Sequence, residues 1–235
     1  MEEFVLRPVA HIRNSLKTKF GIPRQSLLAP ELISKIVFTG EFRGGEALRG
    51  ISEFSHLWII WCFSESVGKE KSFTVRPPRL GGNERVGVFA TRSPFRPNDL
   101  GLSCVKLERV EKTPDEGTVL IVSGADIMDG TPIFDIKPYL PYADKIENAS
   151  GGFAPDGGRV FEVEDPGNAL GVLSGADRET VVSLLRRDPR PRYHDDPERI
   201  YGMRYGEWDI KFRVGEEKVR VLSVDAAVQS EVAAE

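Results

Sequence analysis

Residues 85–107 read RVGVFATRSPFRPNDLGLSCVKL, and this stretch decides how the N-terminal half of the chain is arranged. Over 86–90, alternate residues are valine or alanine, the period of two that indicates a β-strand. Pro94 and Pro97 then disfavour a helix, because proline lacks an N–H and biases the preceding residue toward extended geometry. The stretch therefore predicts a strand, a stiff loop and a second strand over 102–107.

The stiff loop carries two guanidinium groups, on Arg92 and Arg96. A rigid polar loop between strands is a good mount for a binding site, because preset dihedral angles reduce the entropy lost on ligand binding. Proline and arginine are also common in ordinary solvated turns. The residues alone leave both interpretations open.

The hydrophobic pattern elsewhere predicts a mostly β fold. The run 54–63, FSHLWIIWCF, is apolar on both faces and predicts a central strand covered on both sides. Pro8 suggests an edge position for the opening strand. The sequence has no alternating helices and no dinucleotide or Walker fingerprint, which disfavours a Rossmann methyltransferase layout. Further strands are expected over 4–13, 33–42, 118–123 and 133–139.

Composition changes along the chain predict its domain organisation. Residues 145–158, KIENASGGFAPDGG, form a polar, glycine-rich connector. We expect a barrel-like N-terminal domain over 1–145, a linker over 146–158 and a small α+β C-terminal domain over 159–235.

In the C-terminal part, Ser174 and Asp177 have the spacing of a capping box and predict a helix that Pro189 ends. A short strand over 159–164 and a terminal hairpin of 205–214 with 218–225 complete the expected elements. The rigid basic loop 188–193, DPRPRY, is either an RNA contact, with Tyr193 stacking on a base, or a helix exit with exposed arginines.

The composition, 40% hydrophobic and 29% charged over 235 residues, is that of a soluble globular protein. No apolar run reaches the roughly 18 residues that span a membrane, and the N-terminus lacks a signal-peptide pattern, so the cytoplasm is expected. Cys62 and Cys104 are expected to be buried free thiols. The three histidines lack metal-ligand spacing, so no metal is expected.

The net charge of −4 disfavours a uniformly basic nucleic-acid binder. Residues 69–96 nevertheless hold seven basic residues against two acidic ones, and could receive a phosphate backbone. Ionisable groups also crowd a predicted strand end over 126–139, although an acidic turn by itself is usually a solvated hairpin.

Two long motifs, GVFATRSPFRPNDLGLS at 87–103 and DGTPIFDIKPYLPYAD at 129–144, resemble the TrmO (TsaA-like) family of tRNA methyltransferases. The resemblance extends over about 5–224 and includes DPRPRY. It implies that the chain uses S-adenosylmethionine to methylate N6 of threonylcarbamoyladenosine (t6A) at position 37, in the anticodon loop of tRNA-Thr. It also implies a homodimer with cofactor sites near the subunit interface.

The resemblance, the basic segments and the acidic turn together suggest roles for individual residues. The expected cofactor-binding residues are Pro23, Arg24, Gln25, Ser64, Glu65, Arg92, Leu102, Asp126, Ile127, Met128 and Asp129. The expected catalytic residues are Asp129, as the first candidate to accept the proton from N6, then Asp135, with Lys137 and Tyr139. The expected RNA-binding residues are Arg76, Arg79, Arg96, Arg190, Arg192 and Tyr193.

Two other functions fit part of the pattern. The chain could be a non-catalytic module that binds S-adenosylmethionine or RNA, or a methyltransferase that acts on another RNA or on a small molecule. The motifs at 92–98 and 129–139 favour an active enzyme, because they place both signs of charge on adjacent strand-loop units.

Overall fold

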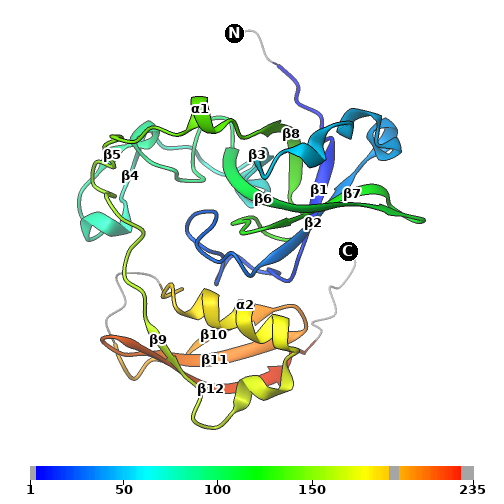
Figure 1. Ribbon diagram of the computed structural model, residues 1–235. Coiled ribbons are helices and arrows are strands. Elements are labelled where there is room, and N and C mark those ends of the chain that lie inside the picture. Colours follow the sequence, from blue (N-terminus) through cyan, green and yellow to red (C-terminus); the bar gives the residue numbers. More distant parts are fainter. Residues whose placement is uncertain (1–3, 191–195, 229–235) are drawn as a thin grey trace.

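The computed structural model describes residues 4–190 and 196–228. They form a small two-stranded sheet and two larger β-sheets, and the two larger sheets lie one above the other (Figure 1). The larger sheet is a closed ring of antiparallel strands in the order β1-β2-β7-β6-β3-β8. This confirms the expected mostly β architecture. The ring strands are β1 (Ala10–Arg13), β2 (Ile33–Phe38), β3 (His56–Cys62), β6 (Leu100–Thr113), β7 (Gly117–Ser123) and β8 (Pro132–Pro138).

The interior of the ring is filled by alternate residues of its strands. In β3, Leu57, Ile59 and Trp61 point inward and are buried, whereas Trp58 and Ile60 on the outer face are only half-buried. The expectation that 54–63 is covered on both sides is therefore wrong. On this outer face, Trp58 and Cys62 line a cavity that is described below.

Several predicted strands are shorter than expected. The opening strand begins at Ala10 rather than residue 4, and it pairs with β2 and β8, so the edge position predicted from Pro8 is also wrong. The strand expected over 33–42 ends at Phe38, and short 3-10 turns follow it. These turns are η1 (Gly40–Gly44), η2 (Glu46–Leu48) and η3 (Ile51–Glu53).

The strand expected over 86–90 is mostly a turn. Only β5 (Val86–Gly87) is extended, paired with β4 (Thr74–Val75), and the 3-10 turn η6 (Val88–Ala90) follows. Buried Val88 ends the ladder because its carbonyl accepts the N–H and the hydroxyl of Thr91, at 3.1 and 2.8 Å. The expected absence of a helix over 93–98 is confirmed.

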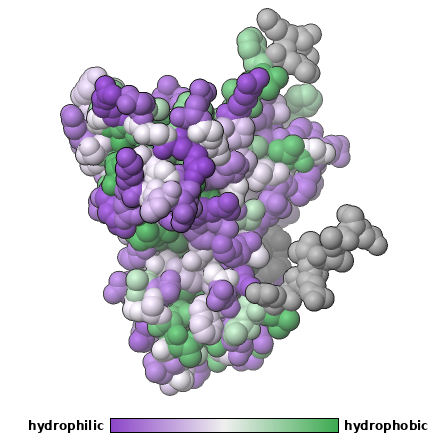
Figure 2. Space-filling model, turned by 90° about the vertical axis from the view of Figure 1, so that its right-hand side faces the viewer, coloured by the Kyte–Doolittle hydropathy of each residue, from purple (hydrophilic) through white to green (hydrophobic). Residues whose placement is uncertain are grey.

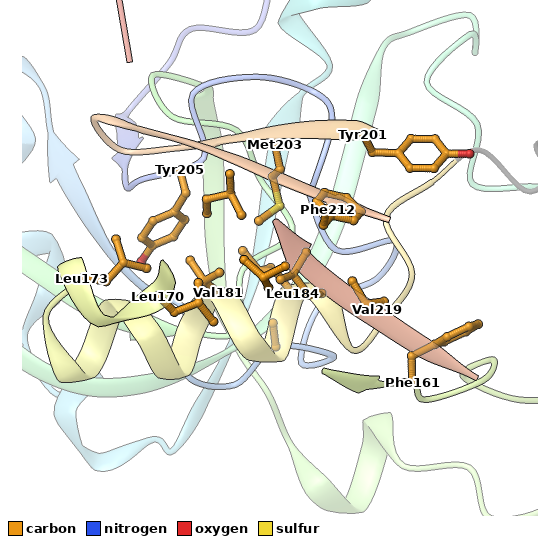
Figure 3. Close-up of a cluster of buried hydrophobic side chains, with 14 of the residues drawn as sticks. Phe161, Leu170, Leu173, Val181, Leu184, Tyr201, Met203, Tyr205, Phe212 and Val219 are labelled. Carbon is orange, nitrogen blue, oxygen red and sulfur yellow. The ribbon is translucent and has the colours of Figure 1, made fainter. Parts of the chain in front are cut away.

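The smaller sheet has the order β10-β11-β12-β9, and its edge strand β9 runs parallel to β12. The helix α2 (Gly175–Leu185) covers one face, and side chains of the helix and sheet interlock between them (Figure 3). As predicted, Ser174 caps the helix by accepting the Asp177 N–H at 3.2 Å. The strands are β9 (Glu162–Glu164), β10 (Tyr201–Tyr205), β11 (Trp208–Val214) and β12 (Lys218–Ala226).

The predicted terminal hairpin is confirmed as β11 and β12, whereas β10 was not expected. The strand expected over 159–164 is present only from Glu162. Among the described residues, no helix is long and apolar enough to cross a bilayer. The face shown in Figure 2 carries mainly hydrophilic residues, with small groups of apolar residues between them. The remaining short elements are η4 (Ser64–Ser66), η5 (Pro78–Leu80), α1 (Pro141–Asp144) and η7 (Ala169–Val172).

The segment 14–32 joins β1 to β2 in the ring but packs into the core of the smaller sheet. Leu16, Ala29 and Leu32 are buried among the residues of that core. Its backbone is also hydrogen-bonded to the C-terminal part, since the hydroxyl of Thr180 donates to the Glu31 carbonyl at 3.0 Å. The segment therefore fixes the two sheets relative to each other.

Replacing a buried side chain of this segment should destabilise the smaller sheet. We expect Leu16→Ala to lower the free energy of unfolding by about 2–5 kcal/mol, because the fully buried leucine would leave a cavity. Val172→Ala, next to the same core but 55% exposed, should change it by less than about 0.5 kcal/mol. Urea unfolding followed by circular dichroism measures both, and equal losses would contradict the packing role of the segment.

Candidate functional site

A cavity of about 710 Å³ opens where one end of the ring meets the segment 14–32 and the proline-rich loop. Its floor is formed by the end of β3, the start of β6 and the turn that follows β7. The lining residues are Lys19, Ile22, Pro23, Arg24, Gln25, Trp58, Trp61, Cys62, Phe63, Ser64, Glu65, Ser66, Thr91, Arg92, Pro94, Phe95, Arg96, Leu100, Gly101, Leu102, Ser103, Asp126, Met128 and Thr131.

Asp126 lies at the floor of the cavity and is the centre of a polar chain. Its Oδ1 accepts a hydrogen bond from Ser103 Oγ at 2.5 Å, and Ser103 Oγ in turn accepts one from Trp61 Nε1 at 2.9 Å. Burial raises the pKa of Asp126, while the Ser103 hydrogen bond and the Arg92 charge oppose that rise. The floor therefore offers a carboxylate that can accept hydrogen bonds. Because burial disfavours its ionised form, that form needs hydrogen-bond donors around it.

The rim of the cavity is built from guanidinium groups. Arg92 donates to the side-chain oxygen of Gln25, which belongs to the facing segment. Arg24 Nη2 donates to the backbone carbonyls of Asp188 and Arg190, at 3.3 and 2.8 Å. Arg96 Nη1 donates to the Thr91 and Ser93 carbonyls and so holds the shape of its own loop. Arg92 and Arg24 thus connect elements that are far apart in the sequence.

A lysine ties two of the cavity walls together. Lys71 Nζ donates to the Ser66 carbonyl at 2.8 Å and forms an ion pair with Asp99. Asp99 adopts a left-handed conformation with φ of 51°, and its carbonyl accepts the Phe63 N–H at 2.7 Å. The loop that carries Arg92 is therefore anchored to the end of β3.

The structure brings most of the expected cofactor-binding residues together. Pro23, Arg24, Gln25, Ser64, Glu65, Arg92, Leu102, Asp126 and Met128 all line the cavity. Ile127 does not, because its side chain is fully buried in the core of the ring. Asp129 also lies outside the lining.

The expected catalytic residues are not gathered in the cavity. Asp129 is engaged elsewhere: it accepts the Asn14 N–H at 2.9 Å and pairs with Lys17 Nζ at 2.8 Å. Asp135 and Lys137 form an exposed ion pair of 3.3 Å on β8. Tyr139 packs against the lining residue Trp58, with ring centroids 5.9 Å apart.

The expected RNA-binding residues are dispersed. Arg76 is exposed, Arg79 pairs with Asp156 at 3.2 Å, and Arg96 lines the cavity. Arg190 Nε pairs with Asp188 at 3.0 Å and its side chain is only 14% exposed, so it is not a solvated cation. Arg192 and Tyr193 lie outside the described residues.

Sequence reasoning missed Trp61, Ser103 and Lys71 as parts of the site. The alternation of β6 could have indicated that Ser103 points inward, since it lies between apolar positions of one face. Both cysteines are free and half-buried, less buried than expected. Cys62 lines the cavity, and burial raises the pKa of its thiol. Within residues 4–190 and 196–228, no cluster of His, Cys, Asp and Glu could hold a metal ion.

Comparisons with known proteins agree on one family. The chain matches the tRNA-methyltransferase O N-terminal domain over residues 11–145 and the TrmO C-terminal domain over residues 174–227. It is 35% identical to the tRNA (adenine(37)-N6)-methyltransferase of Escherichia coli K12 over 234 residues, which cover 96% of this chain and 99% of the relative.

Two further relatives come from Pseudomonas aeruginosa. A protein provisionally named as the S-adenosylmethionine-dependent methyltransferase RcsF is 39% identical over 226 residues, covering 92% of this chain and 96% of its own. A crystal structure of TrmO superposes with a TM-score of 0.75 at 32% identity, covering 96% of this chain and all of that one. The chain therefore belongs to the TrmO family of tRNA methyltransferases.

Proposed function

We propose that this protein is a tRNA methyltransferase that uses S-adenosylmethionine to methylate N6 of t6A at position 37. The observation that carries the proposal is a cavity of about 710 Å³ in which nine of the expected cofactor-binding residues come together. S-Adenosylmethionine supplies an electrophilic methyl group on a sulfonium. Relatives that bear the adenine-37 methyltransferase name support the same target position.

The chemistry of the cavity fits this cofactor. Arg92 and Arg24 at the rim suit a carboxylate, which guanidinium groups bind in a planar, bidentate manner. Asp126 at the floor suits an ammonium or a hydroxyl. Phe95 and Leu102 offer apolar surface for the adenine and the methionine chain. A volume of 710 Å³ lies within the usual range for small-molecule sites.

The residues of the chain would act mainly by positioning. Discharge of a sulfonium needs alignment and exclusion of water more than strong acid chemistry. Two walls of the cavity would align the cofactor and exclude water. One is the half-buried outer face of β3, and the other is the loop that Lys71 anchors. The N6 proton needs an acceptor. Asp129 is the first candidate from the sequence, whereas its ion pair with Lys17 and its place outside the cavity lining favour an anchoring role, and the two roles are tested below.

The tRNA would approach over the basic stretch 69–96. Arg76 is exposed there, and Phe73 and Phe89 beside it are 89% and 77% exposed, so their rings could stack on unpaired bases of an anticodon loop. Arg24 connects the cavity to residues 188–190, which precede the predicted RNA contacts Arg192 and Tyr193 in the sequence. The proposed substrate is tRNA-Thr, encountered in the cytoplasm.

The functional unit is proposed to be a homodimer. Leu102 and Phe95, at the edge of the cavity, are 57% and 43% exposed, and a second copy could cover them and help to close the site. Light scattering at the protein concentrations used for activity assays measures the oligomeric state. A chain that stays monomeric and active would contradict the dimer.

Cofactor binding should be independent of metal and should depend on Arg92. Calorimetry with S-adenosylmethionine in excess chelator is expected to show saturable binding. Arg92→Lys should weaken it on the order of tenfold, because lysine keeps the charge but loses the planar fork. Arg96→Lys is the matched control and should cost less, because Arg96 already donates to two carbonyls of its own loop. Loss of binding with chelator alone, or equal affinities for wild type and Arg92→Lys, would contradict this.

The substrate is tested with two transcripts of tRNA-Thr that differ only in the presence of the threonylcarbamoyl group on A37. We expect methyl incorporation only into the modified tRNA, and mass spectrometry of nucleosides should locate it on t6A. Transfer to both transcripts would contradict the t6A requirement. A protein that binds cofactor and tRNA without transferring a methyl group would be a binding module.

Asp129→Asn and Lys17→Ala separate catalysis from anchoring, because both remove the same ion pair and only the first removes the carboxylate. A proton acceptor would lose about 10²–10⁴-fold in single-turnover rate in Asp129→Asn alone. On the geometry, we expect similar losses of less than about tenfold in both variants, since Asp129 fixes residues 14–17 from outside the cavity. A selective loss in Asp129→Asn would identify it as the proton acceptor.

A further inference from the structure

The polar chain at the cavity floor has a direction that is fixed by chemistry. The indole N–H of Trp61 can only donate, so Ser103 Oγ must accept it, at 2.9 Å. The single hydroxyl proton of Ser103 is then available for Asp126 Oδ1, at 2.5 Å. Asp126 therefore has one carboxylate oxygen held as an acceptor, and the side chain as a whole remains part of the cavity lining.

Two members of this hydrogen-bonded chain, Trp61 and Ser103, are built into strands of the ring, and the third, Asp126, lies in the turn that follows β7. Trp61 on β3 and Ser103 on β6 lie on the inward faces of two paired strands, where Trp61 is opposite Gly101. A Cβ at Gly101 would meet the Trp61 ring at 2.3 Å, so the absence of a side chain at 101 is what lets the indole lie there. Ser103 is only 1% exposed, so Asp126 and Trp61 are the partners that its hydroxyl has in place of solvent.

The electrostatic effect of Ser103 opposes that of burial. Burial raises the pKa of Asp126, and the Ser103 hydrogen bond is the largest of the effects that lower it. The N–H groups of Asp126 itself and Ser26, and the charge of Arg92, act in the same direction as Ser103. Removing the Ser103 hydroxyl should therefore make the carboxylate harder to ionise.

We propose that Trp61 and Ser103 are positioning residues that hold the Asp126 carboxylate toward the cavity as the acceptor for a hydrogen-bond-donating group of the cofactor. The inference rests on the proposed function. The donor is either the ammonium of the methionine part or a ribose hydroxyl, since both recognise a carboxylate in the same way.

The test measures binding of S-adenosylmethionine by calorimetry for wild type and Ser103→Ala from acid to neutral pH. At neutral pH we expect affinity to fall about tenfold or more, as for the loss of a hydrogen bond to a charged group. Affinity should be lost on acidification as Asp126 protonates, and in the variant that loss should begin at higher pH. The other ionisable groups that line the cavity, Lys19, Arg24, Cys62, Glu65, Arg92 and Arg96, are the same in both proteins.

Ser123→Ala is the matched control, because this serine is also buried and its hydroxyl donates to the Glu108 carboxylate at 2.6 Å, away from the cavity. It should bind like wild type over the whole pH range. Trp61→Phe removes the indole donor but keeps an aromatic ring, and should weaken binding in the same direction by a smaller factor.

A second ligand identifies the donor. 5′-Methylthioadenosine has the ribose hydroxyls but no ammonium, so a loss in Ser103→Ala with both ligands assigns the hydroxyl and a loss with S-adenosylmethionine alone assigns the ammonium. Wild-type affinity and pH dependence in Ser103→Ala, or equal losses in Ser123→Ala, would overturn the inference. Failure of the wild-type protein to bind S-adenosylmethionine would instead contradict the proposed function.

Discussion

The site depends on the burial of Leu16, Ala29 and Leu32, which lie in the connection between β1 and β2 but pack into the core of the smaller sheet. The segment that carries them leaves the ring at β1 and returns at β2, so both of its ends are fixed by the ring ladder. Its apolar side chains are meanwhile fixed by the smaller sheet. Between these attachments the chain can only pass over the end of the ring, where Pro23 to Gln25 become one wall of the cavity. Hydrophobic packing in one sheet thus shapes the site at the other.

The opposite wall and the floor follow a different principle, since polar groups are held there at some cost to stability. A buried carboxylate, a left-handed aspartate at 99 and several guanidinium groups near the rim are arrangements that a protein keeps where function requires them. The hydrogen bonds of Ser103 and Lys71 offset part of this cost. The ring makes this arrangement rigid, because Ser103 and Trp61 project from the paired strands β6 and β3.

Local patterns in the sequence predicted those features that depend on neighbouring residues. The capped start of α2, the strands β6 to β8 and the loop with Arg92 all follow from periodicity, proline and capping chemistry. The half-buried outer face of β3 could not be predicted in this way, because an apolar run has the same sequence pattern beside a cavity as beneath a second layer. The ion pair of Asp129 with Lys17 could not be predicted either, since Lys17 lies 112 residues away in the sequence. An acidic turn has the same sequence pattern whether or not its carboxylate forms an ion pair.

Arg24 lines the cavity, and its guanidinium also donates to the carbonyls of Asp188 and Arg190 in the segment that follows α2. A ligand that competes for these two hydrogen bonds would break them, and a partner that moves the two carbonyls would break them as well. By thermodynamic linkage, any such effect of one ligand on the affinity of the other must be matched in reverse. The Arg24 side chain is thus a direct physical contact through which binding in the cavity and binding at residues 188–190 would affect each other.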